Sequence, residues 1–370
     1  MQRHYDAVVI GSGSFGSWIA YTLAQRGLRV ALTDAHGPGN ARSSSGGETR
    51  IIRMSYGSSA VYSRMARESL VLWKRLFAET DSDNLFIQSG ALFTAPMAND
   101  FGVGSAATLA RLNIPHECLT TNALNKRFPQ FKFAPGVTGL FEPEAGVLLA
   151  RRAVQCVAAA AERLGVTQFN LLVNPRTMRT RIPANLYIFA CGPWLPTLFP
   201  KELGKRIFPT RQTIAFFGTP GGDTSFRTPQ MPAWVDFSNG AYTVPDIENR
   251  GFKFGIDVHG PAIDPEHDPR VMTAAETRRI HASAARSFPA LKSAPIIESR
   301  VCVYENTSSG DFLIDRIRDD VWIAGGGSGH GFKHGPAVGR YLADLLENRI
   351  EPEPRFALSS KQTKQARRVF

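Results

Sequence analysis

The chain has 370 residues, of which 43% are hydrophobic and 20% charged, ordinary values for a globular protein that exclude a disordered or collagen-like chain. At roughly 100 to 200 residues per domain, this length indicates two or three domains. Lys and Arg number 43 against 32 Asp and Glu, and the net charge of +11 favours anionic ligands such as phosphate cofactors or carboxylates. The basic residues are scattered outside the tail 361–368, so we expect no nucleic-acid partner.

Four cysteines stand far apart and form no CxxC pair, which is typical of a reducing compartment and indicates neither a disulfide framework nor a metal site. No segment approaches the roughly 18 apolar residues of a membrane span. A strand-like run already begins near Asp6, where a secretion signal would stand. We therefore expect a cytoplasmic protein with no metal and no membrane partner. The cysteines are Cys118, Cys156, Cys191 and Cys302.

The N-terminal residues predict a βαβ unit, with buried strands at 5–10 and 28–33 and a helix at 15–25. Asp34 stands at the end of the second strand. A glycine-rich GxGxxG turn joins the first strand to the helix. This turn consists of Gly11, Ser12, Gly13, Ser14, Phe15 and Gly16.

Each glycine of this turn has a physical task. Gly11 makes the tight turn, Gly13 lets the backbone approach a pyrophosphate, and Gly16 lets the helix pack on the strand. The N-terminus of the helix offers N–H groups to the diphosphate, and the carboxylate of Asp34 can accept hydrogen bonds from ribose hydroxyls. An ordinary strand-to-helix turn with a solvated Asp34 is the alternative. The strand, turn, helix and acid together predict a dinucleotide site.

The rest of the chain divides into segments of different character. A Ser- and Gly-rich segment at 42–47, which includes Ser44, is a candidate cofactor loop. Short strand-like stretches separated by Gly, Pro and Asn recur over 210–258 and are typical of an antiparallel sheet. Other predicted elements are helices at 60–77 and 151–164, an alternating run at 86–93 and an apolar strand at 187–192.

A second glycine-rich junction lies near the C-terminus. A buried strand at 321–324 leads into a segment that includes Gly329 and Gly331, and a helix with Pro336 in its first turn follows. Two such junctions, far apart in sequence, suggest one nucleotide site assembled from both ends of the chain.

Four motifs of the chain occur together, and the set resembles the D-amino acid oxidase superfamily of flavoproteins. Within it the chain is most similar to the branch of monomeric sarcosine oxidase, N-methyltryptophan oxidase and pipecolate oxidase. The motifs are the Gly11 to Gly16 turn with Asp34, Arg50-Ile-Ile-Arg53, Cys302-Val-Tyr304 with Asp311-Phe-Leu-Ile-Asp315, and Gly327-Ser-Gly-His-Gly-Phe-Lys333.

The resemblance implies an α/β fold, α+β overall. It implies a discontinuous Rossmann-like FAD domain at 1–85, 145–205 and 308–370, and a substrate domain with a mainly antiparallel β-sheet at 86–144 and 206–307. The implied activity, in a monomer, is oxidation of a secondary or primary amine carrying a carboxylate. A hydride passes to flavin N5, the imine hydrolyses, and O2 reoxidises the flavin to give H2O2.

The resemblance also assigns flavin contacts. Cys302 matches the position that forms a thioether to the flavin 8α-methyl group, which implies covalently attached FAD; a small buried hydrophobe is the alternative. Arg50 matches a position near the flavin. Lys253 matches a position beside flavin N5, where a positive charge stabilises superoxide. Because Lys253 alternates with Phe252 and Phe254, a solvated sheet face is the alternative there.

Arg53 and Lys333 match the positions that bind the substrate carboxylate, and Lys333 also counts among the flavin-binding positions. A guanidinium fork and an ammonium both suit a carboxylate. The alternative for Arg50 and Arg53 is a shared helical face at i and i+3. Tyr242 and Tyr304 match pocket tyrosines, although an aromatic residue in a sheet is often part of the core.

The chain departs from close relatives, which often carry histidines before Thr49 and at the position of Asp257. Ser45, Gly46 and Asp257 stand there instead, which argues against simple sarcosine turnover. Asp257 either pairs with the ammonium of a larger or dibasic substrate or is an exposed carboxylate.

Two further functions fit part of the sequence. An amino-acid dehydrogenase would use FAD with an acceptor other than O2, and Lys253 argues against it. An RNA-associated flavoprotein would suit the charge of +11, but that branch normally carries a methyltransferase domain for which this chain has no room.

Overall fold

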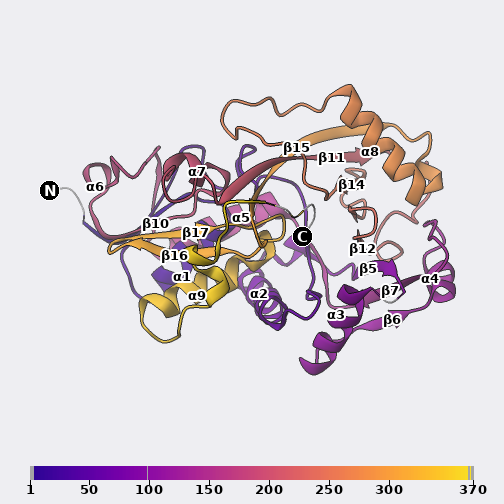
Figure 1. The fold of residues 1–370 in the computed structure, drawn as a ribbon, viewed down its shortest axis with the longest axis horizontal. Helices are drawn as coiled ribbons and strands as arrows, with labels where there is room; N and C mark the ends of the chain where they lie inside the picture. Colours follow the sequence, from indigo (N-terminus) through magenta and orange to yellow (C-terminus); the bar gives the residue numbers. More distant parts are fainter. Residues whose placement is uncertain (1–3, 98, 366, 368–370) are drawn as a thin grey trace.

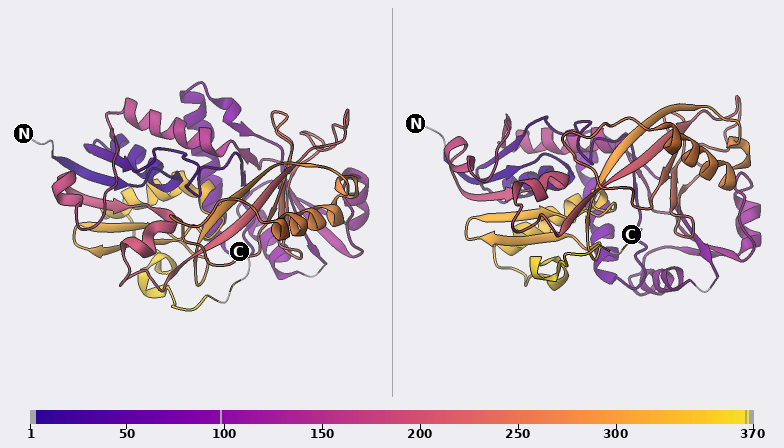
Figure 2. Two further views of the ribbon diagram at one scale, coloured as in Figure 1. Left: turned by 90° about the horizontal axis from the view of Figure 1, so that it is seen from above. Right: turned by 45° about the horizontal axis from the view of Figure 1, so that its top comes forward.

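The computed structural model describes residues 4–97, 99–365 and 367, and the fold of this part of the chain is built around two large β-sheets (Figure 1). One sheet has six strands and is covered by helices; the other has eight strands. The long strands β11 (Ile207–Phe217) and β15 (Ile296–Thr307) pair with each other at the edge of the eight-stranded sheet and reach toward the six-stranded sheet (Figure 2).

The six-stranded sheet has the order β16-β17-β10-β1-β2-β9 and is parallel except for β16, which is antiparallel to β17. Its strands read as apolar runs because both faces are buried. In β1, Ala7 and Val9 join one core cluster, while Val8 and Ile10 join another. The strands are β1 (Tyr5–Ile10), β2 (Val30–Asp34), β9 (Thr167–Asn170), β10 (Ala184–Phe189), β16 (Leu313–Arg318) and β17 (Val321–Gly325).

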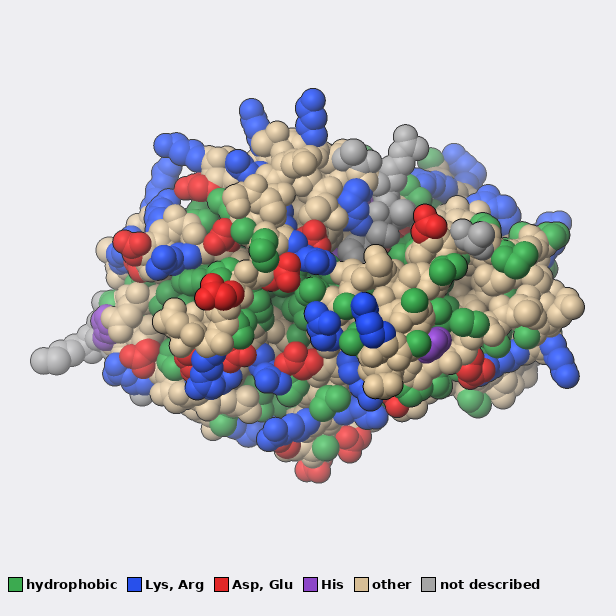
Figure 3. Space-filling view, turned by 60° about the horizontal axis from the view of Figure 1, so that its bottom comes forward, with side chains coloured by type: hydrophobic (Ala, Val, Ile, Leu, Met, Phe, Trp, Pro, Cys, Tyr) green, Lys and Arg blue, Asp and Glu red, His purple; other side chains and the backbone are tan. Residues whose placement is uncertain are grey.

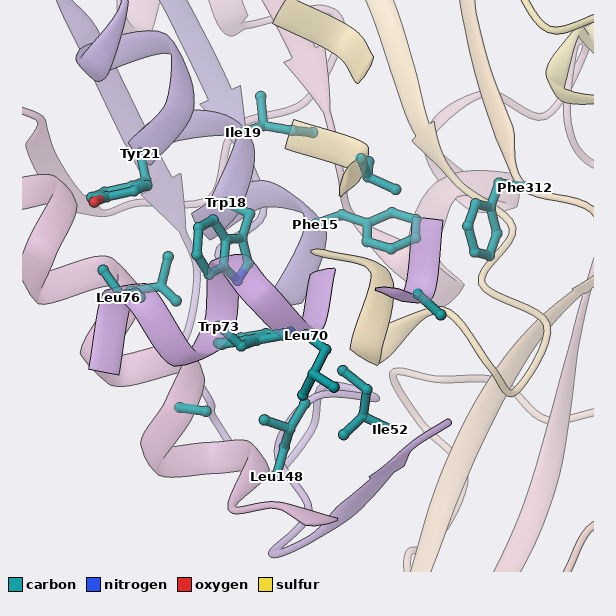
Figure 4. Close-up of a cluster of buried hydrophobic side chains, with 14 of the residues drawn as sticks. Phe15, Trp18, Ile19, Tyr21, Ile52, Leu70, Trp73, Leu76, Leu148 and Phe312 are labelled. Carbon is teal, nitrogen blue, oxygen red and sulfur yellow. The ribbon is translucent and has the colours of Figure 1, made fainter. Parts of the chain in front are cut away.

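Aromatic side chains join the helices beside this sheet (Figure 4). The ring of Trp18 meets the ring of Trp73 edge-on, with centroids 4.9 Å apart. The ring of Phe15 meets that of Phe312 in the same way at 5.3 Å. These contacts fix the helix that follows the glycine-rich turn against its neighbours. The helices are α1 (Ser14–Gln25), α2 (Ala60–Glu79), α5 (Ala150–Arg163) and α9 (Gly335–Leu346).

The eight-stranded sheet has the order β15-β11-β14-β13-β12-β5-β7-β6 and is antiparallel except where β12 pairs with β5. Its core gathers around Phe288, whose ring lies 4.9 Å from that of Phe252 and 4.6 Å from that of Phe131. The remaining strands are β5 (Ala91–Pro96), β6 (Glu117–Leu119), β7 (Val137–Glu142), β12 (Ala233–Asp236), β13 (Ala241–Val244) and β14 (Phe252–Ile256). The remaining helices are α3 (Asp100–Arg111), α4 (Thr121–Arg127), α6 (Met178–Arg181), α7 (Leu195–Leu198) and α8 (Ala274–Ser287).

A small three-stranded sheet contains β3 (Arg50–Ile52), β8 (Gly146–Leu148) and β4 (Phe86–Ile87). The arrangement of this sheet corrects two expectations from the sequence. Arg50 lies on a strand and Arg53 just after it, so the shared helical face is wrong. The alternating run at 86–93 is interrupted, because β4 and β5 belong to different sheets.

The predicted fold class is confirmed, since a mainly parallel sheet stands beside a mainly antiparallel one. The exact domain boundaries stay a prediction. No helix in the described part of the chain is long and apolar enough to cross a membrane. On the face drawn in Figure 3, Lys and Arg side chains are spread among Asp and Glu.

Candidate active site

Most of the predicted cofactor-binding residues line the same cavity, at the carboxyl ends of β1, β2 and β10. Ligands of α/β proteins bind at this edge of the sheet. Gly16 and Lys333 are not among the residues that line the cavity. The predicted residues that line it are Gly11, Gly13, Ser14, Phe15, Asp34, Ser44, Arg50, Cys302, Gly329 and Gly331.

The GxGxxG turn requires its glycines. Gly11 has a φ of +100°, and a Cβ there would lie 2.5 Å from the carbonyl oxygen of Ala190. A Cβ on Gly16 would lie 1.8 Å from the carbonyl oxygen of Gly11, so only glycine lets α1 begin this close to β1. Ser45, which the sequence analysis named only as a departure from close relatives, accepts a hydrogen bond at its Oγ from the N–H of Ser14 at 3.0 Å.

Asp34 lies at the end of β2 with its carboxylate fixed by two backbone donors. Its Oδ2 accepts from the N–H of Ser12 and its Oδ1 from the N–H of His36, both at 2.8 Å. The carboxylate is therefore not freely solvated but is oriented at one end of the cavity, as recognition of a ribose requires.

The second glycine-rich segment packs against the first. A Cβ on Gly329 would lie 2.7 Å from the ring of Tyr304, and one on Gly331 would lie 3.2 Å from the ring of Phe15. The C-terminal segment is thereby held beside both α1 and β15. The glycine-rich turn, the N-terminus of α1 at the cavity and the carboxylate of Asp34 fit the diphosphate and ribose of the FAD that the motifs imply.

Arg50, Lys253 and Cys302 form one cluster around the backbone of Thr49. The carbonyl oxygen of Thr49 accepts hydrogen bonds from Arg50 Nη1 and Lys253 Nζ, each at 2.8 Å. Arg50 Nη2 lies 3.4 Å from Cys302 Sγ and donates to the carbonyl oxygen of Ser44 at 2.6 Å. Arg50 and Cys302 of this cluster line the cavity, whereas Lys253 and Thr49 are not among its lining residues.

Lys253 is buried, with 2% of its surface exposed, so the solvated-face alternative is wrong. The rings of Phe252 and Phe254 fill the core on the other face of β14. Lys253 Nζ lies 5.5 Å from the ring centroid of Tyr242. Burial, with the positive charge of Arg50, holds the pKa of Lys253 well below its usual range.

Arg53 and Lys333 both contact Tyr56, a residue to which the sequence analysis gave no role. The guanidinium carbon of Arg53 is 4.8 Å from the Tyr56 ring centroid, and Lys333 Nζ donates to the Tyr56 hydroxyl at 2.8 Å. Both cations are buried, and neither forms an ion pair with a described carboxylate. Burial, with the charge of Arg53, holds the pKa of Lys333 well below its usual range.

Two buried histidines complete this cluster. The Tyr56 hydroxyl lies 2.8 Å from His334 Nε2 and 3.3 Å from His330 Nδ1. Burial, with the charge of Lys333, holds the pKa of both imidazoles well below the usual value, so both are neutral at pH 7. The sequence signs of this cluster were His330, which stands in the motif from Gly327 to Lys333, and the adjacent His334.

Asp257 accepts a hydrogen bond from the hydroxyl of Tyr304 at 2.9 Å and is half-buried. The exposed-carboxylate alternative is therefore wrong. Burial raises the pKa of Asp257, while the bond from Tyr304 and the charges of Arg53 and Lys333 oppose this rise. Tyr304 lines the cavity, whereas the ring of Tyr242 lies next to Lys253. The structure thus brings the predicted catalytic side chains together.

Comparisons with known proteins agree with this geometry. Residues 6–345 match the family model described as FAD dependent oxidoreductase. The chain is 30% identical to an N-methyl-L-tryptophan oxidase of Salmonella arizonae, over 96% of this chain and 97% of that protein. It is 29% identical to a monomeric sarcosine oxidase of a Bacillus species, over 93% of each.

Among solved structures, the fold is similar to that of L-proline dehydrogenase from P. horikoshii, with a TM-score of 0.81 and 22% identity. The match covers 97% of this chain and 98% of that one. The family model spans most of the chain, and the predicted resemblance is confirmed. The protein therefore belongs to the family of FAD dependent oxidoreductases, among which it is of the sarcosine-oxidase type.

Proposed function

We propose that the protein is an FAD-dependent oxidase of a secondary or primary amine that carries a carboxylate, in the class of N-methyl and cyclic amino acids. The names of the two relatives support this class, since both are oxidases of N-methylated amino acids. At about 30% identity the particular amine is open, and the substitutions at Ser45, Gly46 and Asp257 argue against sarcosine itself.

The observation that carries the proposal is the pair of buried cations, Arg53 and Lys333, without a carboxylate partner in the described part of the chain. Burying an unpaired charge is costly. A substrate carboxylate between the two cations would supply the missing counter-charge, and each charge-assisted hydrogen bond is worth about 1.5 to 3 kcal/mol. Tyr56 holds Lys333 in place for this contact.

When bound, FAD supplies the acceptor for the hydride that leaves the amine carbon and transfers the electrons to O2 to give H2O2. Cys302 lines the cavity beside Arg50, and we infer that its sulfur is the point of covalent attachment. Lys253 is held by the carbonyl oxygen of Thr49, and we infer that its ammonium stabilises the negative charge that develops on oxygen.

Asp257, hydrogen-bonded to Tyr304, lies near the pair of buried cations. The carboxylate of Asp257 lies within electrostatic reach of Arg53 and Lys333 and is oriented by the Tyr304 hydroxyl. A carboxylate here would repel the carboxylate of a substrate and attract a cationic group. It therefore orients the amine end away from Arg53 and Lys333 and favours substrates with a second positive charge.

The test is release of H2O2 from a panel of N-methyl, cyclic and dibasic amino acids, each assayed beside the amine that lacks the carboxylate. We expect peroxide only with the carboxylate-bearing members. A yellow, FAD-loaded protein that reduces an artificial dye but not O2 with the same substrates would instead indicate a dehydrogenase.

A further inference from the structure

Glu305 carries a buried oxygen that the reaction described above does not use. The residue lies on β15, three positions after Cys302, and lines the cofactor cavity. Its Oε1 accepts a hydrogen bond from the N–H of Gly327 at 3.2 Å. Its Oε2 is buried and has no hydrogen-bond partner in the described part of the protein. Such an oxygen weakens a fold unless a ligand supplies a donor.

Three glycines hold this carboxylate closely. A Cβ on Gly327 would lie 3.2 Å from Oε1, one on Gly325 would lie 3.3 Å from Oε2, and one on Gly192 would lie 3.7 Å from Oε2. Backbone from β17 and from the segment after β10 thus surrounds the group. The position of Oε2 is set by the fold before a ligand arrives, which lowers the entropic cost of binding.

The place of Glu305 in the cavity limits which part of FAD it meets. The diphosphate belongs at the turn from Gly11 to Gly16, and the isoalloxazine ring belongs near Cys302. Glu305 is close in sequence to Cys302, where the isoalloxazine ring belongs. Gly192 and Gly327, which surround its carboxylate, line the same cavity as the turn that takes the diphosphate. The part of FAD between the two is the ribityl chain.

The chemistry of the ribityl chain suits Glu305. Its hydroxyl groups are neutral hydrogen-bond donors, whereas a diphosphate would repel a carboxylate. Burial raises the pKa of Glu305 to about 7, although the backbone N–H groups of Gly326 and Gly327 oppose this rise. A further donor at Oε2 would favour the ionised form.

We propose that Glu305 binds the ribityl chain of FAD, with Oε2 accepting a hydrogen bond from one of its hydroxyl groups. This contact depends on the cofactor of the family and not on which amine is oxidised. It requires the isoalloxazine ring to lie near Cys302 but no thioether between them.

The first test measures FAD affinity in a Cys302→Ser background, where a thioether cannot hold the cofactor. Holoenzyme is diluted, and free FAD is quantified by fluorescence after ultrafiltration. Glu305→Ala should raise the dissociation constant of FAD about tenfold or more. Glu305→Gln keeps an acceptor oxygen without the charge and should raise it less. Glu298→Gln is the matched control, because Glu298 lies on the same strand and pairs with Arg250 and Arg300 outside the cavity.

The second test locates the contact with three FAD analogues, each with one ribityl hydroxyl replaced by hydrogen. The analogue that lacks the hydroxyl bound by Glu305 should bind with nearly equal affinity to the Cys302→Ser protein and to the Cys302→Ser, Glu305→Ala double variant. Unchanged FAD affinity in Glu305→Ala would overturn the proposal. So would an equal loss with FAD and all three analogues. If Glu305→Ala does not fold, the same comparison with Glu305→Gln decides.

Discussion

The ammonium group of Lys333 donates a hydrogen bond to the hydroxyl of Tyr56 over 2.8 Å. The same hydroxyl lies 2.8 Å from Nε2 of His334, which is neutral and can accept its proton. The hydroxyl is therefore oriented by the histidine and presents a lone pair to the lysine. A long and flexible side chain is thereby held in one position, which a cation that binds a carboxylate requires.

Replacing Tyr56 by Phe removes this hydroxyl and leaves Lys333 with its hydrogen bond to the carbonyl oxygen of His330, at 3.1 Å. Since one such bond is worth about 1 kcal/mol, Tyr56→Phe should weaken the binding of simple carboxylates about fivefold. Titration of the flavin absorption spectrum with the carboxylate measures this constant. Equal affinity in the two proteins would show that Tyr56 does not position Lys333.

Cys302→Ser should release the flavin. A thioether survives unfolding, so FAD should stay with the wild-type polypeptide after acid precipitation and enter the supernatant of the variant. Cys191→Ser is the control, since Cys191 also lines the cavity but should leave the attachment intact. Wild-type flavin that washes out in acid contradicts the covalent assignment.

Lys253→Met should slow reoxidation of the reduced flavin about a hundredfold or more, while its reduction by substrate changes little. The reason is that only the oxygen step develops the negative charge that this cation stabilises. Stopped-flow measurements under anaerobic and aerobic conditions time the two steps separately. Lys292→Met, at an exposed lysine, serves as control. Equal slowing of both steps would place Lys253 in substrate binding.

The buried histidines predict how stability depends on pH. Burial lowers the pKa of His259 to about 4 and holds the pKa values of His330 and His334 well below the ordinary value of 6.5. Below about pH 6.5 the unfolded chain therefore binds protons that the folded protein does not. The free energy of unfolding should fall as the pH drops from 7 toward 4.

Urea unfolding at pH 7.5 and 5.5 measures this difference. His334→Gln keeps a polar group beside Tyr56 without a titrating imidazole, so it should lose less stability than the wild type over the same interval. If the free energy of unfolding changes equally with pH in both proteins, His334 does not contribute to the pH dependence.

The local pattern of the sequence predicted the βαβ unit well, because buried parallel strands and the GxGxxG turn depend on neighbouring residues. Gly16 shows why, since its requirement comes from the carbonyl oxygen of Gly11 only five residues away. The family motifs then indicated FAD and ten of the residues that line the cavity.

The surroundings of those residues could not be predicted in the same way. Tyr56 and Lys333 are 277 positions apart, and their contact depends on how α2 and α9 bring the two segments together. The sequence analysis assigned no role to Glu305, and only the close approach of Gly192 and Gly327 reveals its buried oxygen. Long-range packing of this kind leaves no periodic sign in a single sequence.

The central claim is that Arg53 and Lys333 bind the carboxylate of the substrate. The most direct measurement is kcat/KM by peroxide release for an N-methyl amino acid and for the same amine without its carboxylate, in the wild type and in Lys333→Met. We predict that the wild type prefers the carboxylate-bearing amine and that Lys333→Met lowers this preference about tenfold or more, chiefly by raising KM. A wild type that turns over the carboxylate-free amine best, or a preference unchanged in Lys333→Met, would contradict the account.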